Sequence, residues 1–277
     1  MIVDEAAVGP IVVLGGSGQT GRGVADMLET SGYTVRRASR RSEWAFDWDD
    51  ETTWSPVLTG ARRIYVVLPE RRFDWARFLV ALSSSGIERA AVLTARNPGV
   101  SGDGIADGAE EAFTGSSIDS AFIRPSWFSQ NFIAGLFSRQ LDATGELRLP
   151  VGDGKEPFID YRDISAVAAQ ALLANDSGTQ SIEVSGPELL GFDEAVSIVG
   201  EVTGRELVYV PISLDEWRRE ALHTKVPEPF VDTLANLFRA IAEHRDEYLS
   251  SGVMGYTGRP ARSFRQTIAD TLAPETS

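Results

Sequence analysis

A strand-like run passes directly into glycines at Ile11-Val12-Val13-Leu14-Gly15-Gly16-Ser17-Gly18-Gln19-Thr20-Gly21, and this stretch decides the fold of the 277-residue chain. The continuous aliphatic run predicts a strand buried on both faces, as in a parallel sheet. Apolar residues at helical spacing predict a helix over Arg22–Ser31, which Gly32 ends. Tyr33–Ala38 then reads as a second strand. The glycines therefore lie between a strand and a helix.

Glycines in this position are typical of a loop that binds a dinucleotide. They permit a tight turn and a close approach of the backbone, and the pyrophosphate rests on the amides at the start of the helix. A glycine-rich turn without a ligand is the alternative, but strand, glycines, helix and second strand follow one another in the required order. We expect the diphosphate to contact Gly15, Ser17, Gly18, Gln19, Thr20 and Gly21.

The end of the second strand indicates which dinucleotide is bound. A protein that prefers NAD usually has an acidic residue there, about 20 residues beyond the glycines, to bind the ribose 2′-hydroxyl. This chain has Ser39-Arg40-Arg41-Ser42 instead, and the next carboxylate is Glu43. Guanidinium groups suit a 2′-phosphate through charge-assisted, often bidentate hydrogen bonds. Ser39, Arg40 and Arg41 therefore predict NADP, with a solvated basic turn as the alternative.

Further candidates for cofactor contacts follow the next strands. Asp47 could accept a hydrogen bond from the adenine amino group, with Trp48 covering the ring, or Asp47 could cap a helix that begins near Glu51. In an open parallel sheet, ligands bind outside the carboxyl ends of the strands. The expected strands Arg63–Leu68 and Ala90–Thr94 would thus bring four residues close to the ribose and nicotinamide, namely Leu68, Pro69, Thr94 and Ala95.

Strand and helix alternate as far as a strand at Ser120–Ile123, which predicts an α/β fold with a doubly wound parallel sheet, the NAD(P)-binding Rossmann fold. The stretch Asn97–Gly108 is polar and glycine-rich, as in a loop over the site. After about Gln130 the pattern changes, and a long helical segment covers Pro229–Leu249. We expect a Rossmann domain over residues 1–155 and a smaller C-terminal α/β subdomain over 156–277, interleaved with the first rather than joined by a linker.

Composition excludes several classes of protein. The chain has 26 basic and 40 acidic residues, a net charge of −14, which argues against binding to nucleic acid. It has no cysteine and only two histidines, so disulfides and most zinc sites are excluded and no metal is expected. Its apolar runs are far shorter than the roughly 20 residues of a membrane span. No signal peptide is visible, and we expect a soluble cytoplasmic protein.

The motif Arg124-Pro125-x-Trp127-Phe128-x-x-Asn131-Phe132, with the glycines and the arginine-ended strand, resembles the NmrA-like group of atypical short-chain dehydrogenases/reductases. The chain is most similar to the festuclavine synthase and agroclavine dehydrogenase family of ergot alkaloid reductases. The supporting segments are Phe46–Trp48, Gly152–Phe158, Gly186–Leu190 and Thr257–Phe264. The resemblance implies an NADP-dependent reductase that acts on an imine, an iminium ion or a related unsaturated small molecule.

The same motif follows the last strand of the expected Rossmann domain, where both cofactor and substrate would lie. We expect Pro125 and Trp127 beside the cofactor. Trp127, Phe128, Asn131 and Tyr161 are expected on the substrate side. An aromatic wall would suit a cationic, cyclic substrate through cation–π attraction. Trp127 and Phe128 could equally belong to the hydrophobic core.

Short-chain dehydrogenases commonly use a Tyr-x-x-x-Lys pair to pass a proton to the substrate. This chain has two lysines, Lys155 and Lys225, and neither lies four residues after a tyrosine. The sequence therefore identifies no catalytic residue; among the acids, Asp107, Glu110 and Glu111 could supply a proton or form a solvated helix face. Either the substrate is an iminium ion that needs no proton at the hydride step, or the protein is a redox sensor that binds NADP without turnover. The extent of the resemblance favours the enzyme.

Overall fold

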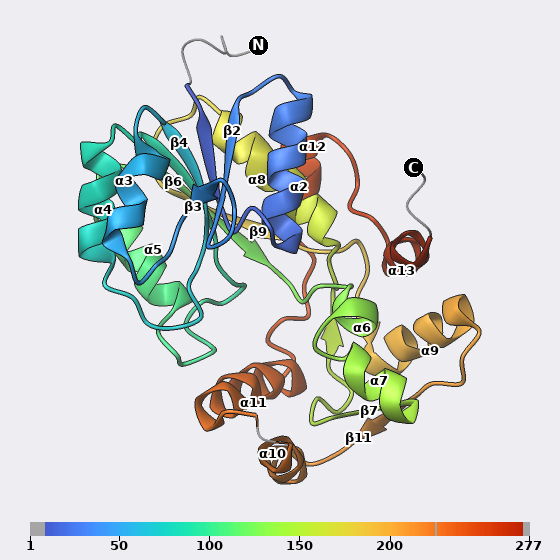
Figure 1. The fold of residues 1–277 in the computed structure, drawn as a ribbon. Helices are drawn as coiled ribbons and strands as arrows, with labels where there is room; N and C mark the ends of the chain where they lie inside the picture. Colours follow the sequence, from blue (N-terminus) through green and yellow to red (C-terminus); the bar gives the residue numbers. More distant parts are fainter. Residues whose placement is uncertain (1–8, 225, 274–277) are drawn as a thin grey trace.

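Seven strands form one parallel sheet in the computed structural model, which describes residues 9–224 and 226–273 (Figure 1). The strand order is β3-β2-β1-β4-β5-β6-β9, so the order reverses beside β1. The strands are β1 (Ile11–Leu14), β2 (Val35–Ser39), β3 (Trp44–Ala45), β4 (Arg63–Val67), β5 (Arg89–Leu93), β6 (Asp119–Pro125) and β9 (Gln180–Val184). The predicted doubly wound α/β fold is confirmed.

The central strand β1 is buried on both faces, as its aliphatic run predicts. All four of its residues are buried, and Ile11 pairs in register with Val35 of β2 on one side and Arg63 of β4 on the other. Successive side chains of a strand point to opposite faces. Ile11 and Val13 accordingly join one hydrophobic core, and Val12 and Leu14 join the core on the other face.

Helices cover both faces of this sheet. One layer contains α2 (Gln19–Thr30), α8 (Tyr161–Leu173) and α12 (Gly252–Thr257), and the other contains α3 (Trp54–Leu58), α4 (Trp75–Ser84) and α5 (Ala106–Thr114), with the short 3-10 helix η1 (Glu51–Thr53) before α3. Helix α2 begins at Gln19, three residues earlier than predicted, because the extended backbone of Gly18 ends the loop there. The predicted loop Asn97–Gly108 likewise gives way to α5 at Ala106.

A smaller lobe has its own hydrophobic core, which includes Phe132, Phe158, Phe192 and Phe264. It lies at the lower right in Figure 1. Its strands form two short pairs, β7 with β11 and β8 with β10. The elements are α6 (Asn131–Ala134), α7 (Ser138–Thr144), β7 (Glu146–Leu149), β8 (Lys155–Glu156), β10 (Leu190–Gly191), α9 (Phe192–Thr203), β11 (Val208–Pro211), α10 (Leu214–His223), α11 (Glu228–Ala242) and α13 (Phe264–Leu272).

The chain crosses between the sheet and the smaller lobe several times. It leaves the sheet after β6, returns through α8 and β9, enters the smaller lobe again at β10 and comes back at α12. Residue 155 lies within the smaller lobe, so the predicted division at that residue does not coincide with the edge of the sheet. The two lobes are interleaved along the chain.

The predicted helix over Pro229–Leu249 is wrong in its C-terminal third. Helix α11 ends at Ala242, because His244 has a left-handed backbone with φ of 59°. The amide of Arg245 then donates to the carbonyl of Ala240, which closes the end of the helix. The segment that follows runs back to the sheet.

Candidate functional site

The glycine loop lies at the carboxyl end of β1 and leads into α2. Gly15 has φ of 69°, and a Cβ on Gly21 would lie 2.2 Å from the carbonyl oxygen of Gly15, so both positions require glycine. The cap residue Gly18 gives α2 no side-chain cap, and the first-turn amides of a helix have no partner within the helix. Ser17, Gly18 and Gln19 are exposed, whereas Thr20 is buried. The loop therefore presents backbone donors to an anion.

The four arginines near the end of β2 have different roles. Arg36 donates to two backbone carbonyls and lies 4.5 Å from the ring centroid of Trp44. Arg37 pairs with two carboxylates of α2, whose hydrogen bonds raise its pKa. Arg40 and Arg41 are exposed, and no carboxylate among residues 9–224 and 226–273 forms an ion pair with either. Those two guanidinium groups, beside the half-buried Ser39, are available to a phosphate.

The next two candidates are held by local contacts. The side chain of Asp47 accepts the backbone amide of Asp49 at 3.0 Å, and Asp50, not Asp47, caps η1. The alternative in which Asp47 caps that helix is therefore wrong. Trp48 packs edge-on in an aromatic cluster, with ring centroids 4.9 Å from both Phe46 and Phe78. Its ring is partly buried against the core on the α4 face.

The other predicted cofactor contacts lie at the ends of β4, β5 and β6. Leu68, Thr94 and Ala95 are partly exposed, and Pro69 and Pro125 are buried. These strands run parallel to β1 in the same sheet, so their carboxyl ends lie on the same edge as the glycine loop. The structure thus brings these residues to the edge where ligands of such sheets bind.

An ion pair that sequence reasoning missed lies directly behind Thr94. The Thr94 hydroxyl donates to Oε1 of Glu110 at 2.8 Å, and Nε of Arg124 donates to the same oxygen at 2.9 Å. A second bond joins Nη2 of Arg124 to the other oxygen of Glu110. Glu110 is buried, and it raises the pKa of Arg124. Glu110 was one of three acids in its helix that the sequence left open, and no local pattern connects it to Arg124.

Trp127 lies between two other aromatic rings. Its centroid is 5.7 Å from that of Phe137 and 5.6 Å from that of Phe238, with interplanar angles of 18° and 16°. Both phenylalanines line a cavity of about 890 Å³ bounded by α7, α10 and α11, together with Trp217 and Leu234. Trp127 itself is partly exposed. The ring of Trp127 therefore lies between the end of β6 and the phenylalanines that line this cavity.

The remaining substrate-side candidates lie close to Trp127 in the chain. Phe128 forms a backbone bridge with Ile159 and packs against the core on the α8 face. Asn131 begins α6, and Tyr161 begins α8. The side chain of the buried Gln130 accepts the amide of Tyr161 at 3.3 Å. Asn131 and Tyr161 are thus brought near each other at the point where the two lobes meet.

Buried charged groups join the lobes. Arg96, at the end of β5, donates to the carbonyls of Asp246 and Tyr248 at 3.0 Å each, which fastens the segment between α11 and α12 to the sheet. Glu156 of β8 is fully buried, and its carboxylate oxygens have no hydrogen-bond partner among the described residues. Burial raises the pKa of Glu156 well above its ordinary value, Asp246 adds to this effect, and Arg96 opposes it.

A second buried carboxylate holds the C-terminal segment. Asp160 caps α8 by accepting the amide of Arg162, while Asp163 is fully buried and accepts the backbone amide of Arg262 at 2.7 Å. Asp163 also pairs with the guanidinium of Arg262 and lies 3.7 Å from that of Arg259. Burial raises the pKa of Asp163, and Arg262 opposes this.

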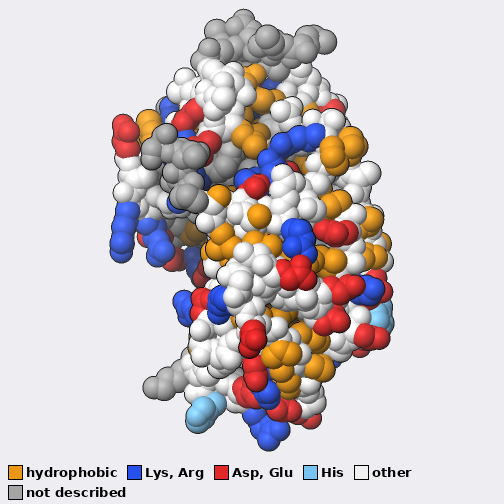
Figure 2. Space-filling view, turned by 90° about the vertical axis from the view of Figure 1, so that its right-hand side faces the viewer, with side chains coloured by type: hydrophobic (Ala, Val, Ile, Leu, Met, Phe, Trp, Pro, Cys, Tyr) orange, Lys and Arg blue, Asp and Glu red, His pale blue; other side chains and the backbone are white. Residues whose placement is uncertain are grey.

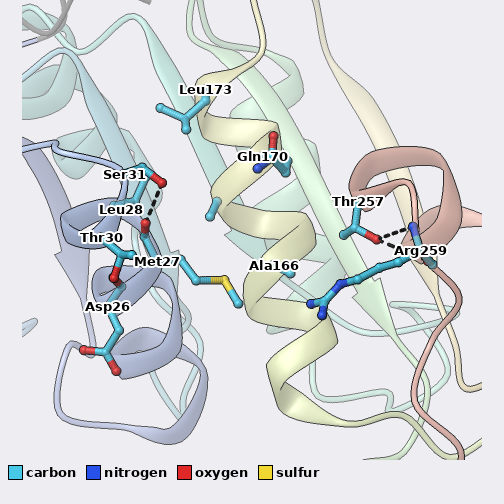
Figure 3. A pocket seen from close by; sticks show the side chains of 11 residues that line it. Asp26, Met27, Leu28, Thr30, Ser31, Ala166, Gln170, Leu173, Thr257 and Arg259 are labelled. Carbon is cyan, nitrogen blue, oxygen red and sulfur yellow. Dashed lines mark hydrogen bonds between the residues drawn. The ribbon is translucent and has the colours of Figure 1, made fainter. Parts of the chain in front are cut away.

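A cavity of about 380 Å³ lies between α2, α8 and the end of α12, where Arg259 extends toward Ala166 (Figure 3). On the α2 side it is lined by Asp26, Met27, Leu28 and Thr30 of that helix and by Ser31 just after it, so it lies away from the glycine loop. Acidic and basic side chains are interspersed on the face drawn in Figure 2. Within residues 9–224 and 226–273, we find no group of metal-ligating side chains and no helix able to span a membrane.

Comparisons with known proteins agree with this architecture. Residues 109–256 match the model of the NmrA-like family. The chain is 30% identical to an uncharacterized oxidoreductase, YesF, of Bacillus subtilis over 97% of both chains. It is also 30% identical to agroclavine dehydrogenase of Claviceps fusiformis, over 94% of this chain and 96% of that protein.

Among solved structures, triphenylmethane reductase of Citrobacter sp. complexed with NADP(H) superposes with a TM-score of 0.72 at 18% identity, covering 95% of this chain and 100% of that one. The fold and both resemblances expected from the sequence are confirmed. The expected class, an NADP-dependent oxidoreductase, agrees with these relatives.

Proposed function

This chain belongs to the NmrA-like family, and from that premise we propose that it is an NADP-dependent reductase that transfers hydride to an imine, an iminium ion or a related unsaturated small molecule. The observation that carries the proposal is the contrast among the arginines at the end of β2. Arg36 and Arg37 are engaged within the protein, while Arg40 and Arg41 are exposed and without carboxylate partners in the described part of the chain.

The residues at the carboxyl edge fit NADP. The uncapped start of α2 would hold the diphosphate on backbone amides. The loop is tight at Gly21, where a Cβ would collide with the carbonyl of Gly15, and a tight glycine loop allows the backbone to approach the diphosphate closely. Arg40 and Arg41 would hold the 2′-phosphate, with Asp47 beside the adenosine. Leu68, Thr94 and Pro125 would border the nicotinamide. When bound in its reduced form, the cofactor supplies the hydride.

The substrate side favours a molecule whose reduction needs no proton donor. The chain has no Tyr-x-x-x-Lys pair, and Glu110 of α5 is held in an ion pair by Arg124 of β6. An iminium carbon accepts hydride and loses its positive charge in the same step. Orientation and exclusion of water would then provide most of the acceleration. The partly exposed ring of Trp127 suits a cationic ring system.

The test is to incubate the protein and NADPH with a panel of cyclic imines and enones while following the absorbance of the reduced cofactor. We expect oxidation of NADPH by at least one cyclic imine, and slower oxidation of NADH under the same conditions. Tight binding of NADPH without oxidation by any member of a broad panel would instead support the redox-sensor interpretation.

A further inference from the structure

The hydroxyl of Thr94 donates its hydrogen within the protein, so toward a bound molecule it can only accept a hydrogen bond. It has a single hydrogen. Its two hydrogen-bond partners among the described residues are both acceptors, Oε1 of Glu110 at 2.8 Å and the carbonyl of Ile123 at 3.4 Å. Thr94 is partly exposed at the end of β5, on the same edge as the glycine loop. A hydrogen-bond donor on a molecule bound at this edge can therefore bond to the oxygen of Thr94.

The ion pair behind Thr94 fixes this orientation. Both carboxylate oxygens of Glu110 accept hydrogen bonds from Arg124, and Oε1 also accepts the hydroxyl of Thr94. The side chain of Glu110 is 10% exposed, and that of Arg124 is 24% exposed. Water therefore competes little for the carboxylate, and the proton of Thr94 stays directed toward it.

This polarity fits a protonated nitrogen and does not fit a carbonyl. Hydride transfer to a ketone builds negative charge on oxygen, which needs a hydrogen-bond donor. A protonated imine instead brings its own N–H donor and a positive charge. The acceptor at Thr94 complements this donor, and Glu110 offsets the charge of Arg124, which would otherwise repel a cation.

We propose that Thr94 accepts the N–H of a protonated cyclic imine and that Glu110 and Arg124 position its hydroxyl, so that this trio specifies the substrate class. The inference rests on the proposed function. In the step, hydride from the reduced nicotinamide forms the new C–H bond, and the C=N π pair becomes the lone pair of nitrogen. The products are a neutral amine and oxidised cofactor, and no proton is taken from the protein.

The N–H donor is present in the protonated imine, in the transition state and in the product amine, so its hydrogen bond to Thr94 stabilises the bound substrate and the transition state alike. Interactions of this kind change KM rather than kcat. Thr94→Val should therefore raise KM for a cyclic imine about tenfold and leave kcat within about twofold. Thr94→Ser, which keeps the hydroxyl, should restore KM.

Calorimetric titration of the NADPH-loaded protein with two saturated cations tests the contact without turnover. N-methylpiperidinium has one N–H, whereas N,N-dimethylpiperidinium has the same charge and none. Thr94→Val should weaken only the first, about tenfold, while Glu110→Gln should weaken both. Thr59→Val is the matched control, because the Thr59 hydroxyl bonds to the carbonyl of Ser55 on α3, before β4.

Equal effects of Thr94→Val on the two cations, or no effect on either, would overturn the assignment of Thr94. Titration of the same proteins with NADPH separates this result from a failure of the proposed function. Because Thr94 also borders the nicotinamide in the proposed function, the cation titrations of wild type and Thr94→Val are both made at saturating NADPH. If wild type binds no NADPH, the proposed function fails; if it binds NADPH but does not distinguish the cations as predicted, only the role of Thr94 fails.

Discussion

The nucleotide-binding end of the crevice comes from one continuous stretch of sequence, whereas the junction between the two lobes is assembled from residues far apart in the chain. The glycine loop and its arginines all lie within residues 11–41. The junction joins Arg96 to carbonyls of residues 246 and 248, and Asp163 to Arg262. An exposed anion site needs only backbone amides and side chains that reach solvent, so a local motif can supply it. Buried charges require partners, which any element can provide.

The ion pairs of the two regions also differ in how much they contribute to the free energy of unfolding. At the nucleotide end, Arg37 and Asp26 form an ion pair whose side chains are 33% and 58% exposed. At the junction, Asp163 is fully buried. Exposed pairs contribute about 0–1 kcal/mol, while removal of one partner from a buried pair costs about 3–5 kcal/mol. Stability should therefore depend on the junction, and cofactor affinity on the nucleotide end.

The largest expected effect on stability comes from Asp163→Ala. The variant leaves the guanidinium and the backbone amide of Arg262 without their acceptor. We expect the free energy of unfolding in urea to fall by about 3–5 kcal/mol.

Asp26→Ala is the matched control, since it removes an exposed carboxylate that also pairs with an arginine. It should cost less than about 1 kcal/mol. Similar losses for the two variants would remove the energetic distinction between the regions.

The second effect concerns the close contact in the glycine loop. Gly21→Ala places a methyl group against the carbonyl of Gly15, so the loop or the start of α2 has to move. We expect a loss of about 1–3 kcal/mol in unfolding free energy, together with weaker binding of NADPH in a fluorescence titration.

Gly108→Ala provides the comparison, because Gly108 is also helical and nothing lies within 4 Å of its added Cβ. That variant should gain about 0.5–1 kcal/mol and keep its NADPH affinity. A stable Gly21→Ala variant with unchanged affinity would show that the contact does not shape the loop.

The third effect is a pH dependence at the junction. Burial raises the pKa of Glu156, so the folded state keeps this proton at pH values where the unfolded state has lost it. Stability from this group is complete below the ordinary pKa of about 4.3 and decreases as pH rises toward the raised value, by at most about 1.4 kcal/mol per pH unit.

Glu156→Gln stays neutral, so its unfolding free energy relative to wild type should increase between about pH 4 and pH 7. Urea titrations of both proteins at each pH measure this difference, with Asp246 and Arg96 present in both. A difference that stays constant over the range would contradict the buried, unpaired state of Glu156.

Local signals made the sheet and the glycine loop predictable. The aliphatic run of β1 and the glycines after it occur in uninterrupted order, and the glycines lead directly into α2. The early end of α11 was missed because the left-handed conformation of His244 has no glycine to signal it.

The substrate side was less predictable because its contacts are not local. Fourteen positions separate Glu110 from Arg124, and only the packing of α5 beside β5 and β6 brings them together. Asp160 lies at the position before α8 and caps it, whereas Asp163 lies in the first turn of that helix. Two aspartates three residues apart carry the same helix-start signal, and tertiary packing decides which of them is buried against Arg262.

The most direct test of the account is the affinity of the protein for NADPH and for NADH, before and after Arg40→Glu combined with Arg41→Glu. We predict that wild type prefers NADPH. In the double variant, the dissociation constant for NADPH should rise about 100-fold or more, since two charge-assisted contacts to the 2′-phosphate are lost, while that for NADH changes by less than about threefold. Equal losses for both cofactors would contradict the assignment of these arginines to the 2′-phosphate.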